Sequence, residues 1–320
     1  MKIKFLFGCI LFSAHLCGQQ LTYVPDDHFE QELIDTGFDD VLDDYVLTSN
    51  IDTIEILNLA FRGISDLTGI EDFEELTVLD CQSNYLTGID LSEMSHLLQF
   101  NCFGNQLLEL DISHNSHLSE LYCSSNQLTS LDVSQNPDLF ILHCAYNAIE
   151  NLNVSQNPDL VILYAPGNVF DVLYTNGAIS LNHLDCSWSS VTRLDVSHNI
   201  NLTELDCQFN QLTCLNVANG NNDNFNYFWP GNNPNLTCIE VDDVDWSASN
   251  WLSIDPQVSF SQYCNNGCSS STTDLNEYTS SSKNPIQILD LMGRETTFKA
   301  NMPLVYVYDD GSVAKVFTIE

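Results

Sequence analysis

The stretch LYCSSNQLTSLDVSQNPDL at residues 121–139 decides the fold of this chain. The same pattern returns one unit later as LHCAYNAIENLNVSQNPDL and stands one unit earlier as FNCFGNQLLELDISHNSHL. The shared pattern is L-x-x-L-x-C-x-x-N-x-L-x-x-L-[DN]-[VIL]-S-x-N. Units aligned on the leucines start every 21 residues, at Leu76, Leu97, Leu118, Leu139, Leu160, Leu181 and Leu202. A degenerate unit from Ile54 precedes them, which predicts a repeat protein of about eight turns.

This repeat resembles that of the bacterial leucine-rich repeat family, in its internalin-like form, with cysteine in place of the third leucine. The resemblance covers residues 54–241. It implies a solenoid in which each unit is one coil and stacked leucines form a continuous core. The short strands around L-x-C are then expected to make a parallel sheet on the concave face.

An asparagine follows each strand at the same repeat position, where the chain turns inward. Its amide is expected to satisfy backbone groups of that turn and of the next coil, because buried backbone groups must be paired. The position is held by Asn84, Asn105, Asn126, Asn147, Asn168 and Asn210. Ser189 replaces the asparagine in one unit, which predicts a local irregularity there.

Six cysteines share the inward position of the strand, and Ala165 takes it in one unit. Neighbouring parallel strands lie about 4.8 Å apart and their Cβ vectors run parallel, so the Cβ separation exceeds the roughly 3.5–4.5 Å of a disulfide. Buried apolar packing is therefore predicted, because no histidine or CxxC spacing supports metal ligation by these thiols. The six are Cys81, Cys102, Cys123, Cys144, Cys186 and Cys207.

The last four cysteines follow a different pattern. Cys214 and Cys238 lie in the matching phrases LTCLNV and LTCIEV, and Cys264 and Cys268 close the repeat body. An even set at the end of an exported solenoid predicts one or two disulfides that close the last coil. Three connectivities are open, and Cys238–Cys264 is preferred because it ties the last coil to the segment that covers it.

The first eighteen residues have the form of a secretory signal peptide. Lys2 and Lys4 precede an apolar run and small residues, which predicts cleavage before Gln19. No later stretch approaches the roughly 18 consecutive apolar residues of a membrane span. The mature chain is therefore predicted to be exported, with no transmembrane span.

The charge of the body is strongly negative. Residues 19–269 hold 37 Asp and Glu against Arg62 and Arg193 alone, so their net charge is 2 − 37 = −35. Such a surface repels phosphate backbones and anionic lipid, which excludes nucleic acid as a partner. Two readings of the charge stay open: attraction of cations or a basic partner, and a solvated surface suited to a salty exterior.

Segments outside the repeat are expected to cap it. Residues 19–53 form the N-terminal cap, with a short helix over PDDHFEQELIDTG. Residues 219–235 are expected to be an irregular insertion. Residues 242–268 form the C-terminal cap, to which Trp246 and Trp251 are expected to supply core side chains.

The C-terminal part changes in composition. Residues 269–283 form a polar linker, and LVYVY and VAKVFTIE alternate around Asp310-Gly311, which predicts a β-hairpin within a small β domain at 284–320. This tail resembles a type IX secretion sorting domain in Asn284-Pro285, ILDLMGRE at 288–295, Tyr306 to Tyr308, Gly311 and Lys315. That resemblance implies contact with the secretion machinery. It places the protein outside a Bacteroidetes-type bacterium, secreted or on its outer-membrane surface.

No catalytic constellation, cofactor motif or metal-ligand spacing is present, so the chain is predicted not to be an enzyme and to need no cofactor. Strand side chains that flank the inward Leu and Cys form a band rimmed by acids on the concave face, which indicates a ligand-binding surface. The band consists of Phe103, Tyr122, His143, Tyr146, Tyr164 and Trp188. A surface or secreted binding module for a protein or polysaccharide, in the manner of an adhesin, is favoured. The alternative is an acidic structural spacer without a specific ligand, and a third reading is a cation-dependent matrix protein.

Overall fold

The computed structural model of the chain describes residues 20–264, 268, 285–289, 303–308 and 313–317. The chain divides into two compact units, Met1–Ser269 and Ser270–Glu320. The expected signal peptide at 1–18 and the linker at 269–283 lie outside the described residues. No helix within the described ranges is long and apolar enough to cross a membrane.

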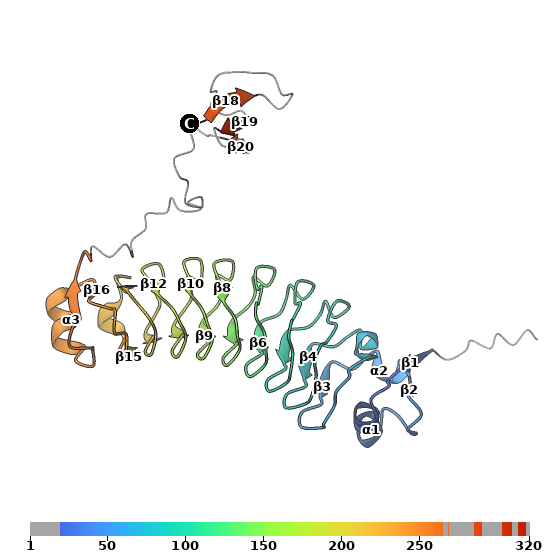
Figure 1. Cartoon of the computed structure of the whole chain (residues 1–320). Coiled ribbons are helices and arrows are strands. Elements are labelled where there is room, and N and C mark those ends of the chain that lie inside the picture. Colours follow the sequence, from blue (N-terminus) through green and yellow to red (C-terminus); the bar gives the residue numbers. More distant parts are fainter. Residues whose placement is uncertain (1–19, 265–267, 269–284, 290–302, 309–312, 318–320) are drawn as a thin grey trace, which may run out of the picture. The chain divides into compact units, whose positions relative to one another are not determined.

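The first unit is a β-solenoid whose successive coils stack side by side (Figure 1). One strand from each of nine coils contributes to a parallel sheet in which residues one repeat apart stand in register, such as Leu121 and Leu142. The predicted leucine-rich repeat solenoid is therefore confirmed. Its strands are β3 (Ile56–Asn58), β4 (Val78–Asp80), β5 (Gln99–Asn101), β6 (Glu120–Tyr122), β7 (Ile141–His143), β9 (Ile162–Tyr164), β11 (His183–Asp185), β13 (Glu204–Asp206) and β15 (Tyr227–Trp229).

The prediction of an irregular insertion at 219–235 is wrong. After the short 3-10 helix η2 (Asn222–Asn224), this segment supplies β15, which pairs in parallel with β13 and adds a coil. Phe228 stands in register with Leu205, and Asn233 takes the role of the turn asparagine. The pattern was hidden because phenylalanine and proline replace the usual leucine and cysteine in a stretch rich in asparagine.

A second parallel sheet, absent from the sequence prediction, runs along another side of the later coils (Figure 1). Its strands are β8 (Asn151–Asn153), β10 (Val172–Tyr174), β12 (Arg193–Asp195), β14 (Cys214–Asn216), β16 (Cys238–Glu240) and β17 (Ser259–Ser261). β10 and β12 share only the pair Val172–Arg193, whereas β12 and β14 share three pairs. At the turn where an irregularity was expected, Ser189 Oγ accepts from Asn168 N (3.2 Å) and donates to Ser187 O (3.3 Å), in place of the amide contacts of the other turns.

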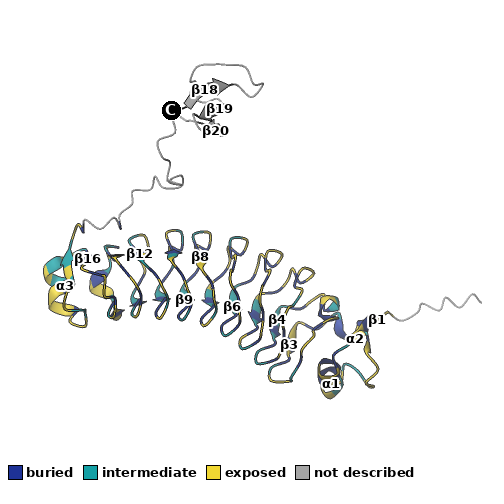
Figure 2. Cartoon of the chain, in the orientation of Figure 1, coloured by how far each residue is buried: buried dark blue, intermediate teal, exposed yellow. Residues whose placement is uncertain are grey.

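The leucine positions and the cysteine column lie in the interior of the coils (Figure 2). All six column cysteines are fully buried and unpaired, and Ala165 continues the column without exposure. Burial raises the pKa of the Cys123 thiol to about 12, and raises that of Cys102 well above its usual value, with neighbouring thiols adding to the rise. The predicted packing role of these cysteines is confirmed.

The buried thiols give a prediction about reactivity. In the native protein none of the six column cysteines should react with Ellman's reagent at pH 8, because they are buried and their raised pKa values keep them protonated. In guanidinium without reductant, all six should react. Absorbance at saturation gives the count, and fast native labelling of the column would contradict the packing role.

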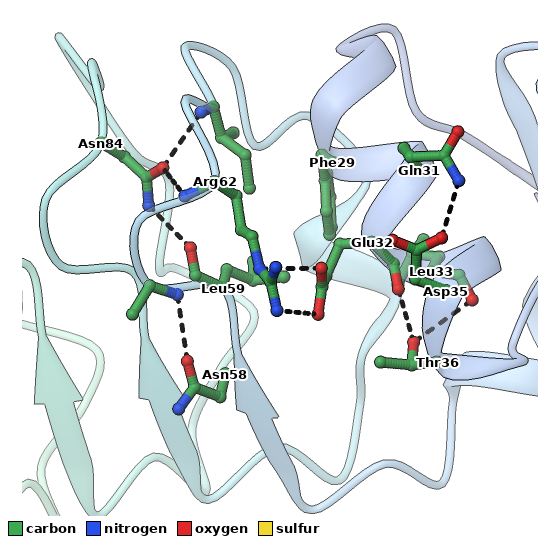
Figure 3. Close-up of polar contacts among 12 residues, drawn as sticks. Phe29, Gln31, Glu32, Leu33, Asp35, Thr36, Asn58, Leu59, Arg62 and Asn84 are labelled. Carbon is green, nitrogen blue, oxygen red and sulfur yellow. Dashed lines mark hydrogen bonds and ion pairs between the residues drawn. The ribbon is translucent and has the colours of Figure 1, made fainter.

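Turn asparagines link each coil to the one before it. Asn84 Nδ2 donates to Leu59 O in the preceding coil (2.8 Å) and to Cys81 O in its own (2.9 Å), and its Oδ1 accepts from Arg62 N (3.1 Å) and Ile64 N (3.0 Å), as Figure 3 shows in part. The amides thus reach the preceding coil, not the next one as expected. The error lay in the direction alone, since the sequence does not fix which neighbour the side chain faces.

A second asparagine ladder occupies the buried S-x-N position of the repeat. Asn136 Nδ2 donates to Ile112 O (3.0 Å) and to Asn115 O (2.9 Å), both one coil earlier. Asn157 repeats the arrangement with Val133 O and Asn136 O. The two ladders hold the coils together at separate corners of the solenoid.

The N-terminal cap contains the predicted helix, α1 (Asp27–Thr36), which Asp26 caps at its start and Gly37, with φ 84°, ends in the left-handed region. Arg62 forms a two-point ion pair with the buried Glu32 of α1, with Nε–Oε2 at 2.8 Å and Nη2–Oε1 at 3.0 Å (Figure 3). The cap is thereby joined to the first coil. Its other elements are β1 (Leu21–Tyr23), β2 (Tyr45–Leu47), α2 (Thr48–Ile51) and the 3-10 helix η1 (Ile70–Asp72).

The C-terminal cap is built on α3 (Val244–Asn250) and on Trp251. Trp251 is buried and contacts Phe228, Trp246 and Phe260 through its ring. The expected core role therefore holds for Trp251, whereas Trp246 is half-buried and packs against the core from outside.

Two disulfides close this end of the solenoid, Cys238–Cys264 and Cys214–Cys268. The first is the pairing that the sequence favoured. The second ties β14 to the end of the cap.

The second unit contains a three-stranded antiparallel sheet in the order β18 (Pro285–Leu289), β19 (Pro303–Tyr308), β20 (Val313–Phe317). β19 and β20 form the predicted hairpin. The Asp310-Gly311 turn and Asn284 lie outside the described residues.

Candidate functional site

The face of the nine-stranded sheet presents columns of side chains, because residues one repeat apart stand in register across neighbouring strands. The last residue of each strand points away from the core, since the middle residue points inward and successive side chains alternate. From β4 to β15 this outer column consists of Asp80, Asn101, Tyr122, His143, Tyr164, Asp185, Asp206 and Trp229.

Three consecutive members of the outer column form a contacting aromatic group. The ring centroid of His143 lies 5.0 Å from that of Tyr122, in an edge-to-face arrangement, and 5.3 Å from that of Tyr164. The Tyr122 hydroxyl donates to Glu120 Oε2 (2.8 Å), and burial together with this carboxylate raises the pKa of Tyr122 to about 12. Burial lowers the pKa of His143, so the group carries no charge of its own at neutral pH.

A second column lies where each coil turns, one residue before the turn asparagine or before the residue in its place, Arg62 or Ser189. Here the backbone adopts positive φ in every coil, the left-handed region that bulky side chains rarely occupy. Glycine and serine hold it in several coils, but large aromatic residues hold it in four. The residues are Phe61, Ser83, Gly104, Ser125, Tyr146, Gly167, Trp188, Phe209 and Asn232.

Three of the four aromatic members of this turn column contact a neighbour although they are exposed. Trp188 is 60 % exposed and stacks on Phe209, with ring centroids 3.8 Å apart. Tyr146 lies over Gly167, where an added Cβ would approach its ring to 2.7 Å. A side-chain hydrogen bond with Tyr146 is among the causes that raise the pKa of Tyr164, after burial and the Asp185 charge.

The structure groups most of the predicted site residues but not all. Tyr122, His143, Tyr164 and Tyr146 form one linked cluster, and Trp188 belongs to a second with Phe209. Phe103 is 41 % exposed, and no ring contact within the described part of the chain joins it to the others. Three exposed aromatics of the same face were missed, because they lie in the two coils that depart most from the repeat pattern: Phe61, Tyr227 and Trp229.

Acidic groups continue the face beyond the aromatic cluster. Asp185 and Asp206 follow Tyr164 in the outer column, and His183 Nδ1 lies 2.7 Å from Glu204 Oε2 on the same two strands. Burial raises the pKa of Asp206 and the Asp185 charge adds to the rise, against hydrogen bonds from Gln208 that lower it. No group of three or more His, Cys, Asp or Glu among the described residues is arranged to hold a metal ion.

Comparison with known proteins shows the fold. No protein-family model matches the chain, and no curated protein sequence matches it. Among solved structures, the functional domain of InlJ from Listeria monocytogenes, described as including a cysteine ladder, is 30% identical with a TM-score of 0.55. The match covers 75% of this chain and 61% of that domain, so this chain spans about three fifths of its length.

Two further structures agree in fold at lower identity. Internalin C2 from Listeria monocytogenes is 19% identical with a TM-score of 0.57, covering 68% of this chain and 94% of that one. A leucine-rich repeat protein of Leptospira interrogans is 22% identical with a TM-score of 0.52, covering 66% and 55%. The protein is therefore a leucine-rich repeat β-solenoid that has internalin-type proteins among its structural neighbours.

Proposed function

We propose that the protein is an exported, non-catalytic binding protein that holds a protein ligand across the face of the nine-stranded sheet. The turn column supports this most directly. Aromatic residues at positive φ cost roughly 1–3 kcal/mol each, whereas glycine occupies the same position at Gly104 and Gly167 without strain. Strain of this kind is concentrated at functional sites, and exposed aromatic side chains are the usual anchors of protein interfaces.

The wider setting of the proposal rests on the two ends of the chain. Two disulfides fit an oxidising, extracellular compartment. In this proposal the C-terminal tail addresses the protein through type IX secretion machinery to the exterior of a Bacteroidetes-type bacterium. There the nine-stranded face serves as an adhesin, for which a polysaccharide is the second ligand class.

An acidic structural spacer is the competing function, and the net charge of −36 favours it. A spacer needs solubility and length but no defined surface. It would give no reason for Tyr146 to lie against Gly167 or for Trp188 to stack on Phe209. The binding proposal accounts for both contacts.

A binding array distinguishes the two functions. The full chain is applied to purified extracellular proteins and polysaccharides beside the variant Tyr122→Ala, Tyr164→Ala, Trp188→Ala. Losing three anchors of one interface should cost at least about 2 kcal/mol, which is more than tenfold in affinity. A control variant removes exposed apolar side chains outside the nine-stranded sheet, Tyr174→Ala, Ile179→Ala and Ile200→Ala, and should bind as the native chain does. Hits that both variants keep, or an array without hits, would leave the spacer as the better account.

A further inference from the structure

The end of the nine-stranded face that carries Asp185 and Asp206 is acidic, and its negative charge favours basic protein ligands. No lysine or arginine occupies an outward position of any of the nine strands, which carry Asp80, Glu120, Asp185, Glu204 and Asp206. The two arginines of the solenoid are placed elsewhere: Arg62 pairs with Glu32, and Arg193 lies in β12 of the second sheet. A ligand on this face therefore meets aromatic rings and negative charge with no lysine or arginine beside them, and the imidazole of His183 is held by Glu204.

Asp185 and Asp206 stand side by side at the centre of this end. They are in register across β11 and β13, with Tyr164 before them in the column and Trp229 after them. Asp185 Oδ1 accepts hydrogen bonds from Ser187 N (2.9 Å) and Ser187 Oγ (2.7 Å), and Asp206 accepts from Gln208 N (3.1 Å) and Gln208 Nε2 (2.9 Å). Neither takes part in the ion pairs that the described residues form. Two like charges are thus held together and oriented without a lysine or arginine of the chain, although His183 lies near enough to act on Asp206 and lower its pKa against the effect of burial.

We infer that this face takes an extended peptide segment of a partner protein, with an arginine side chain placed over Asp185 and Asp206 between Tyr164 and Trp229. The inference rests on the proposed function and names its ligand class. A planar guanidinium bridges neighbouring carboxylates through paired hydrogen bonds and stacks on aromatic faces, whereas an ammonium does neither as well. Cation–π contact with a tyrosine and a tryptophan adds to the attraction.

Spacing along the face sets the length of the segment. From Tyr122 to Asp206 the column crosses four strand intervals, which at about 4.8 Å each is roughly 19 Å. An extended chain advances about 3.3 Å per residue, so about six residues cover this distance. The segment carries aromatic or apolar residues over Tyr122, His143 and Tyr164 and arginine at its other end.

Fluorescence anisotropy with capped hexapeptides tests the inference on the full chain. The probe carries aromatic residues followed by one arginine at its other end, and companion probes carry lysine or citrulline in place of that arginine. The double variant Asp185→Asn, Asp206→Asn should bind the arginine probe roughly tenfold more weakly or worse. Replacing arginine by citrulline in the probe should weaken binding to the native chain by a similar factor.

The matched control is Asp111→Asn, Asp132→Asn. These two aspartates also lie in consecutive coils, and each accepts a turn hydrogen bond of 2.9 Å, from Ser113 N and Ser134 N. The control changes the net charge by the same amount but should keep the affinity of the native chain. Equal losses in both variants would show diffuse charge attraction and overturn the site. Equal binding of the lysine probe would overturn the choice of arginine.

Failure of this inference can be told from failure of the proposed function. If the array yields a protein ligand that depends on Tyr122, Tyr164 and Trp188 but not on Asp185 and Asp206, the binding function stands and the arginine site is wrong. If no ligand depends on the aromatic residues either, both are wrong.

Discussion

Asn126→Ala is expected to lower the free energy of unfolding by about 3–5 kcal/mol, although it removes a single polar side chain. Asn126 Nδ2 donates to Cys102 O (2.9 Å) and Cys123 O (3.1 Å), and its Oδ1 accepts from Leu107 N (3.0 Å). Alanine leaves Leu107 N without a partner, which costs about 1–3 kcal/mol. It also removes one of the two amide hydrogen bonds that Cys102 O and Cys123 O each accept, at about 0.5–1.5 kcal/mol apiece, since Asn105 and Asn147 supply the others. Guanidinium unfolding followed by circular dichroism measures the change.

Two variants separate this effect from the general cost of losing an amide. Asn201→Ala removes an exposed asparagine that donates to Ile179 O (2.9 Å), and it should shift stability by about 0.5 kcal/mol or less. Asn126→Asp keeps the acceptor but faces Cys102 O and Cys123 O with oxygen instead of a donor, so it should be no better than alanine. A loss below about 1 kcal/mol for Asn126→Ala would mean that the ladder contributes little.

Removing the longer cross-link, with Cys214→Ala and Cys268→Ala, should cost about 4 kcal/mol. The bridge joins residues 54 apart in the sequence, and the chain-entropy relation gives about this value for a loop of that size. The variant Cys238→Ala, Cys264→Ala opens a loop of 26 residues and should cost slightly less, about 3.5 kcal/mol. Guanidinium midpoints of the two variants and the native chain supply the comparison.

Reductant provides the control for the cross-link prediction. It should lower the native midpoint but leave a variant that lacks both bridges unchanged, because the other described cysteines carry no disulfide. If the Cys214→Ala, Cys268→Ala variant unfolds at the native midpoint, the C-terminal cap holds without this bridge, through Cys238–Cys264 and the packing of Trp251 against its aromatic neighbours.

Much of the fold could be predicted because one physical requirement repeats. Each coil must bury its leucines against the next, so the period, the strand positions and the inward cysteines follow from the sequence. The coil around Phe228 was missed because a different apolar residue meets the same requirement there. The second sheet, on strands such as β8 around Leu152 and β10 around Leu173, was not predicted, although its strands are as long as those of the first sheet.

The candidate site was less predictable than the core. Alternation along the strands placed Tyr122, His143 and Tyr164 on one face, and the ring distances show that they meet. The contact of Tyr146 with Gly167 and the stack of Trp188 on Phe209 depend on the positive φ at the turn. Residue type does not predict positive φ at positions where bulky aromatic residues adopt it.

The direction of the asparagine bonds also bears on how this protein can change over generations. Each amide bonds backbone groups of its own and the preceding coil, and backbone groups are the same whatever side chains the coils carry. In-frame duplication or deletion of a 21-residue unit by unequal recombination therefore preserves these joints. The ligand surface can lengthen or shorten by one strand, about 4.8 Å, at a time. Point mutation at the turn column changes which side chain each coil presents to the ligand.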